Sequence, residues 1–113
     1  MSHFTQIDAD QSFVPKGTPM FSDLIAQLSE DSSLKSTRRR DMISGLRRVA
    51  EALAMAPDVV PCHGRWLQPR LATISPAMHG ISAKTWQNAV SNVRSAMAHA
   101  GIVDQRFNRI TDL

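Results

Sequence analysis

The residues whose types and spacing most clearly suggest ligand binding are the arginines that follow Ser36. Between Lys35 and Arg48 the chain carries six basic residues and a single acid, Asp41. The planar guanidinium group of arginine suits phosphate oxygens and guanine edges. A solvated helix would instead mix its charges in i, i+4 pairs, and basic residues at a helix start oppose the helix dipole. The pattern favours a helix that faces an anion, with an ordinary solvated surface as the alternative.

A second stretch, residues 82–101, combines amides, hydroxyls and basic side chains without any acid. Lysine and arginine bind phosphates, whereas asparagine, glutamine and serine bond either phosphates or base edges. Together the two stretches predict a surface for double-stranded DNA, with Asn88 and Arg94 as the best candidates for base edges. The candidate residues are Thr37, Arg38, Arg40, Ser44, Arg47, Arg48, Lys84, Gln87, Asn88, Ser91 and Arg94.

Catalysis and metal binding find little support in the residue types. The chain has no tyrosine and no glycine-rich phosphate loop. Its single cysteine, Cys62, and its four histidines lack the spacing of a zinc site. His63 follows Cys62 directly, and such sequence neighbours rarely form a nucleophile and base. We predict no catalytic residue, no metal ligand and no cofactor.

Amphipathic helices must position the candidate residues. Apolar side chains recur at helical spacing, and strand patterns are weak throughout. Trp66 and Trp86 are assigned to packing rather than to base stacking, which needs an exposed ring. The predicted helices lie near residues 20–30, 37–55, 67–74 and 83–100. The predicted core contains Leu24, Leu28, Leu46, Val49, Leu53, Leu71, Trp86, Val93 and Met97.

Polar residues and a glycine mark the ends of the second and fourth helices. Ser36 or Thr37 can accept the free amide hydrogens of the second helix, and Ser82 can do the same for the fourth. Gly101 is well placed to close the fourth helix in a left-handed conformation. We therefore expect capped starts for both helices.

Prolines shape the middle of the chain. Pro69 suits only the first turn of a helix, so the third helix should begin near Gln68 or be distorted there. Val59 and Val60 lie between two prolines, which favours a short extended connector over a paired strand.

Length and composition fit one small domain. The 113 residues are 42% hydrophobic, which is enough for a modest core, and the net charge of +3 agrees mildly with a polyanionic partner. No apolar run is long enough to cross a membrane, and no signal peptide pattern is present. The single cysteine suits a reducing compartment. We expect a flexible tail over residues 1–17, a helical domain over 18–102, and a linker over 103–113.

The order of these motifs resembles the N-terminal core-binding domain of the tyrosine recombinases, the phage integrase family. The resemblance covers roughly residues 18–102. The second helix matches loosely, through Ser36 or Thr37, Arg40 and the Leu46-Arg47 pair. The fourth helix is similar to the family's Ser-x-x-Thr opening, Ser-x-x-Arg middle and closing glycine, through Ser82, Thr85, Ser91, Arg94 and Gly101.

The resemblance implies an all-α, SAM-like orthogonal bundle of four to five helices that clamps duplex DNA from one side. In that family a C-terminal domain carries the chemistry, with an arginine, a lysine, a His-x-x-Arg pair and a nucleophilic tyrosine. Because this chain shows no such constellation, the resemblance implies a non-catalytic chain whose residues 103–113 begin the linker to that domain. The implied partners are double-stranded DNA and the catalytic domain of the same protein, with self-association on DNA left open and no membrane. The implied setting is a cytoplasmic, nucleoid-associated protein of bacterial or phage origin.

Two other functions stay open. The chain could be a small DNA-binding regulator of the helix-turn-helix type, or a helical protein-interaction domain with an ordinary charged surface. Salt separates DNA from protein partners, because counterion release makes DNA affinity fall steeply as salt rises.

Overall fold

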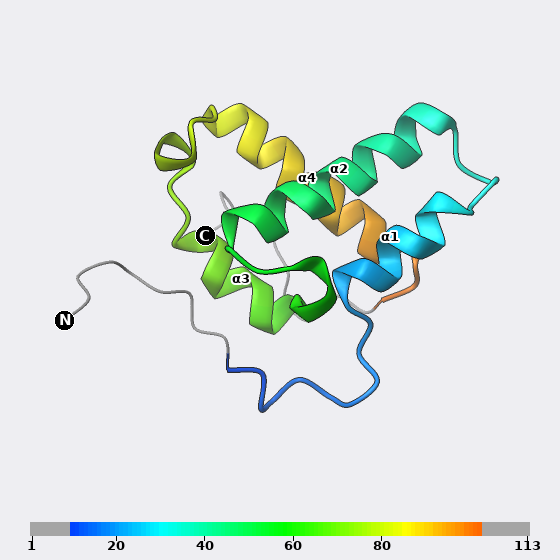
Figure 1. Ribbon diagram of the computed structural model, residues 1–113, viewed down its shortest axis with the longest axis horizontal. Helices are drawn as coiled ribbons and strands as arrows, with labels where there is room; N and C mark the ends of the chain where they lie inside the picture. Colours follow the sequence, from blue (N-terminus) through cyan, green and yellow to red (C-terminus); the bar gives the residue numbers. More distant parts are fainter. Residues whose placement is uncertain (1–9, 103–113) are drawn as a thin grey trace.

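The computed structural model describes residues 10–102, which form a bundle of four α-helices (Figure 1). Two short 3-10 turns, η1 and η2, lie in the connectors. The described residues contain no strand, and the only β-type pairing among them is one isolated bridge. The all-α prediction is therefore confirmed for this part of the chain. In chain order the elements are α1 Phe21–Ser29, α2 Ser36–Ala52, η1 Pro57–Val59, α3 Gly64–Ala72, η2 Pro76–His79 and α4 Ala83–His99.

The two longest helices, α2 and α4, have 17 residues each and cross at the centre of the molecule (Figure 1). The crossing is close because α2 presents Gly45 to α4. A Cβ atom at Gly45 would lie 2.7 Å from the Cβ atom of Asn92 and 2.9 Å from the carbonyl oxygen of Ala89. Both distances are too short for a larger residue unless one helix shifts. The backbone of α2 thus rests directly on α4.

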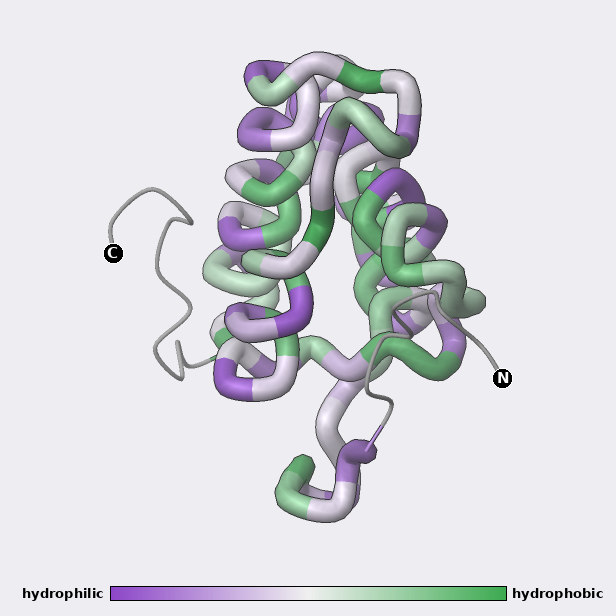
Figure 2. The backbone as a smooth tube through the Cα atoms, turned by 90° about the vertical axis from the view of Figure 1, so that its left-hand side faces the viewer, coloured by the Kyte–Doolittle hydropathy of each residue, from purple (hydrophilic) through white to green (hydrophobic). Residues whose placement is uncertain are grey.

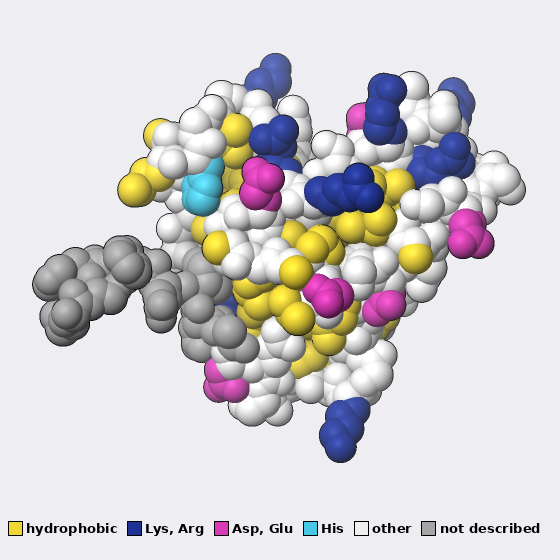
Figure 3. Space-filling view, in the orientation of Figure 1, with side chains coloured by type: hydrophobic (Ala, Val, Ile, Leu, Met, Phe, Trp, Pro, Cys, Tyr) yellow, Lys and Arg dark blue, Asp and Glu magenta, His cyan; other side chains and the backbone are white. Residues whose placement is uncertain are grey.

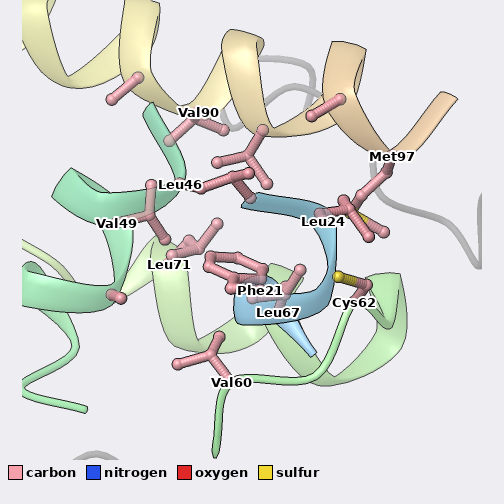
Figure 4. Close-up of a cluster of buried hydrophobic side chains, with 14 of the residues drawn as sticks. Phe21, Leu24, Leu46, Val49, Val60, Cys62, Leu67, Leu71, Val90 and Met97 are labelled. Carbon is pink, nitrogen blue, oxygen red and sulfur yellow. The ribbon is translucent and has the colours of Figure 1, made fainter. Parts of the chain in front are cut away.

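The core is built from the inner faces of all four α-helices. Figure 4 shows Phe21, Leu46 and Leu71 pointing toward one another from α1, α2 and α3, with Val90 above them on α4. In Figure 2 the helical turns alternate between hydrophilic and hydrophobic residues, as amphipathic helices require. All nine residues predicted for the core are buried, which confirms that prediction. Both tryptophan rings are also enclosed, so neither is available for base stacking.

The helix ends agree with the sequence at α4 and differ at α2. The Ser82 hydroxyl accepts a hydrogen bond from the Thr85 amide at 3.0 Å, and Gly101 has φ +77°, as predicted. The predicted cap of α2 is wrong, because Ser36 already lies inside the first turn. The N-cap residue of α2 is Lys35, whose side chain makes no capping hydrogen bond. The arginine-rich helix therefore starts with amide hydrogens that no side chain caps.

Helices α2 and α3 also have boundaries that differ from those predicted. Helix α3 begins at Gly64 and keeps Pro69 in its interior. Proline removes the hydrogen bond to the Arg65 carbonyl, but both residues are exposed, and burial of the residues around Trp66 holds the turn. Helix α2 ends early because Ala54 adopts a left-handed conformation with φ +57°.

The described part of the predicted N-terminal tail is tied to the bundle. The Asp10 carbonyl oxygen accepts hydrogen bonds from Trp66 Nε1 at 3.0 Å and from Arg70 Nη2 at 3.3 Å. Gln11 Nε2 donates to the Val59 carbonyl oxygen at 2.8 Å. All three bonds end on backbone carbonyl oxygens. Such bonds leave no periodic pattern in the sequence. Residues 1–9 of the predicted tail and the predicted linker, 103–113, lie outside the described residues.

Candidate nucleic-acid interface

Two grooves run along the outer face of α2, one on each side. The first, called here the α1–α2 groove, has a volume of about 620 Å³ and is lined by Ser29, Ser36, Arg39, Arg40, Ile43, Ser44, Arg47, Arg48 and Glu51. The second, called here the α2–α4 groove, has a volume of about 420 Å³ and is lined by Asp41, Ser44, Gly45, Arg48, Thr85, Asn88, Ala89, Ser91 and Asn92. Ser44 and Arg48 line both. The exposed ridge of α2 therefore stands between two hollows of different composition.

The α1–α2 groove is dominated by arginine. Arg40 and Arg47 are exposed and Arg48 is partly buried. Among the described residues, the side chains of these three arginines make no hydrogen bond and no ion pair. Figure 3 shows Lys and Arg side chains gathered along the upper edge of the molecule, where the surface is hollowed. The guanidinium N–H groups of Arg40, Arg47 and Arg48 are thus available to an external anion.

Two other arginines at the start of α2 are engaged within the protein. Arg38 Nη1 donates to the Oδ1 atom of Asn92 on α4 at 3.0 Å, and Arg39 Nη1 donates to the Asp31 carbonyl oxygen at 2.8 Å. Arg38 therefore ties α2 to α4, although other donors of its guanidinium group stay available. Arg38 is one of the candidate residues for the DNA surface, and the sequence pattern does not predict its bond to Asn92.

Asp31 organises the loop that leads into the arginine run. Its carboxylate accepts hydrogen bonds from the Ser33 hydroxyl and amide, and lies 2.6 Å from Nε2 of His99 at the end of α4. These bonds, that from the Ser33 hydroxyl foremost, lower the pKa of the Asp31 carboxyl to about 2. The start of α2 is thereby held against the C-terminal end of α4.

The α2–α4 groove brings predicted residues of both helices together. Ser44 and Arg48 from α2 lie along the same hollow as Asn88 and Ser91 from α4. The structure thus brings these four predicted residues together. Three further polar residues line the groove and are not among the predicted site residues, namely Asp41, Thr85 and Asn92. A glycine in the middle of an amphipathic helix was the available sign, because it often marks a close approach of two backbones.

Other predicted residues lie elsewhere. Gln87 and Arg94 are partly buried and line neither groove. At 100° per residue they lie roughly 140° to 160° around α4 from Asn92, which faces α2. Thr37 and Lys84 are exposed but line neither groove. The helical period identified the outer face of α4 but not the flank that meets α2.

The described residues show no alternative chemical centre. Burial raises the pKa of the Cys62 thiol to about 12, so the reactive thiolate form is suppressed. Burial also lowers the pKa of the adjacent His63. Within residues 10–102 no three His, Cys, Asp or Glu side chains gather as metal ligands, and no helix is long and apolar enough to cross a membrane.

Comparison of the chain with protein-family models, with curated proteins and with solved structures finds no match. Function must therefore be argued from the geometry and chemistry of the site. The two grooves beside α2 bring together six of the eleven predicted site residues.

Proposed function

We propose that the chain binds double-stranded DNA through α2 and its two flanking grooves, without catalysing a reaction itself. The observation that carries this proposal is the gathering of Arg40, Arg47 and Arg48 along one groove with no partner among the described residues. Like charges held close together repel each other, so this arrangement gains from an external anion. The DNA backbone offers regularly spaced phosphates and releases bound cations when arginines replace them.

Duplex DNA fits this site better than single strands do. A B-DNA major groove is about 12 Å wide and admits an α-helix, which the exposed ridge of α2 can supply. Proteins that hold single strands stack bases on exposed aromatic rings. Here both tryptophan rings are buried, and no aromatic side chain lines either groove.

The resemblance to recombinase core-binding domains supports a more specific version of the proposal. In that version the four helices form a SAM-like bundle that clamps DNA, while a separate catalytic domain cuts and joins the strands. The tyrosine-free chain lacks the nucleophile for this step. Since no family model matches, this version rests on the motif order and on the position of α2 and α4. It retains the proposed partners, which are duplex DNA and that catalytic domain.

The helix-turn-helix alternative has less support. That motif joins two helices through a turn of three or four residues. Among the described residues the shortest connection between α-helices, residues 30–35 between α1 and α2, has six. A protein-interaction domain remains as the outcome in which DNA is not bound.

A pair of matched double variants tests the proposal. Arg40→Ala/Arg47→Ala removes two charges beside α2, whereas Lys16→Ala/Arg65→Ala removes two exposed charges outside both grooves. Fluorescence anisotropy with a labelled duplex should show at least about tenfold weaker binding for the first variant, because charge-assisted hydrogen bonds are lost. The control should bind nearly as well as the wild type. Equal weakening by both variants, with unchanged melting temperatures, would overturn the proposed site.

A further inference from the structure

One acidic residue occupies the otherwise neutral or basic α2–α4 groove. Asp41 is the only acid among the described residues that line it. Its side chain is exposed and forms no hydrogen bond or ion pair with another described residue. Arg48 lines the same groove without pairing with it. The carboxylate therefore keeps its full capacity to accept hydrogen bonds from a ligand.

A carboxylate in this position discriminates between the parts of a DNA duplex. It repels phosphates, so it disfavours the backbone in the α2–α4 groove. On base edges in the major groove, carboxylates characteristically accept a hydrogen bond from N4 of cytosine. Asp41 therefore admits base edges and selects among them.

The neighbours of Asp41 in the α2–α4 groove can contact further bases. Asp41, Ser44 and Arg48 follow one another at i, i+3 and i+7 on one stripe of α2, and Asn88 faces them from α4. Seven residues of α-helix span about 10.5 Å, which corresponds to about three base-pair steps of 3.4 Å. Arginine pairs with O6 and N7 of guanine. The stripe can thus contact two bases about three base pairs apart.

We propose that the two grooves bind different parts of the duplex. In the α2–α4 groove, Asp41 selects a cytosine about three base pairs from a guanine that Arg48 binds. The α1–α2 groove, with Arg40 and Arg47, holds the backbone irrespective of sequence. The α2–α4 groove carries the sequence preference. This inference rests on the proposed function, because it requires that duplex DNA occupies the site.

Asparagine at position 41 provides a sharp test. Asp41→Asn keeps the size of the side chain, removes the charge and adds an amide donor. Asparagine pairs with N6 and N7 of adenine. The variant should therefore shift the preference at one position from cytosine to adenine, and it should bind unrelated sequences more tightly because a repulsive charge is gone. Asp41→Ala should bind unrelated sequences more tightly without gaining a preference for adenine.

The experiment selects bound duplexes from a library with a randomised central segment, using the full chain at low salt. The control is Glu30→Gln, which neutralises an exposed acid outside both grooves. We expect about fivefold preference for cytosine in the wild type and in the control, a switch to adenine in Asp41→Asn, and loss of the preference in Asp41→Ala. Circular dichroism melting must first show that every variant is folded. Binding without any preference, or an unchanged preference in Asp41→Asn, would overturn this inference while leaving the proposed function standing. A folded wild type that binds no duplex in the library would overturn both.

Discussion

Arginine occupies two contrasting environments in this molecule, one on α3 and one on the outer face of α2. On α3, Arg70 is only 8% exposed, and its guanidinium carbon lies 4.3 Å from the ring centroid of Trp66. It donates hydrogen bonds to the carbonyl oxygens of Trp66 at 2.7 Å and of Asp10 at 3.3 Å. On α2, the side chains of Arg40 and Arg47 are exposed and have no hydrogen-bond or ion-pair partner among the described residues.

This contrast shows that surroundings, rather than residue type, separate a structural arginine from a binding arginine. A guanidinium group has five N–H donors. Around Arg70 the protein itself engages them and covers the flat face of the group with an aromatic ring. Around Arg47 they are left for solvent or a ligand. Net charge treats both arginines alike, so it cannot make this distinction.

Arg70→Ala should have the largest effect on folding stability. The change removes a buried stacking contact and hydrogen bonds to two carbonyl oxygens, so the free energy of unfolding should fall by about 3 kcal/mol. Urea unfolding measures this quantity. Arg65→Ala, an exposed change on the same helix, is the control and should cost less than about 1 kcal/mol. An equal loss of unfolding free energy in Arg70→Ala and Arg65→Ala would show that Arg70 has no special structural role.

Gly45→Ala should have the next largest effect, because it separates the two helices that form the α2–α4 groove. The added methyl group would meet Asn92 and the Ala89 carbonyl at distances below 3 Å, and such overpacking should cost about 2 kcal/mol. The neighbouring exposed change, Ser44→Ala, should stay within about 0.5 kcal/mol. A Gly45→Ala variant that is as stable as the wild type would show that the helices do not touch there.

Asp31→Ala should have a smaller effect that depends on pH. The pKa of the Asp31 carboxyl is lowered in the folded state to about 2, so its contribution to stability is present above about pH 4 and is lost as the pH falls toward 2. The melting temperatures of wild type and variant should therefore converge on acidification. Asp58→Ala removes an exposed acid elsewhere and serves as the control. A wild-type advantage over Asp31→Ala that stays constant down to pH 2.5 would contradict the assigned hydrogen bonds.

Arg47→Ala should have the smallest effect on folding. Because its side chain is exposed and makes no hydrogen bond or ion pair with another described residue, the free energy of unfolding should change by less than about 0.5 kcal/mol. The same urea titrations as for Arg70→Ala provide the measurement. A loss comparable to that of Arg70→Ala would identify Arg47 as a structural residue.

The sequence predicted the helices and the core well, because apolar periodicity reports burial directly. Leu46 and Val93 mark the inner faces of α2 and α4, as the spacing required. The predicted start of α3, near Gln68, was wrong because burial of Trp66 and Leu67 outweighs the local preference of proline. Contacts through the Asp10 carbonyl left no trace in side-chain patterns.

The candidate site was predictable only in part. Helical periodicity separates an inner from an outer face, but it does not say which flank of the outer face meets a neighbouring helix. Asn88 and Ser91 were therefore assigned together with Gln87 and Arg94, although only the first two line a groove with α2. The side of approach is fixed by the crossing at Gly45, which is a tertiary feature.

The measurement that tests the central claim most directly is the affinity of the full chain for a duplex as a function of salt concentration. With Arg40 and Arg47 on phosphates, the logarithm of the association constant should fall linearly with the logarithm of salt, with a slope of about −2. The dissociation constant at physiological salt should lie on the order of 10⁻⁴ to 10⁻⁶ M. A folded chain that does not bind the duplex, or that binds it with a slope near zero, would contradict the account.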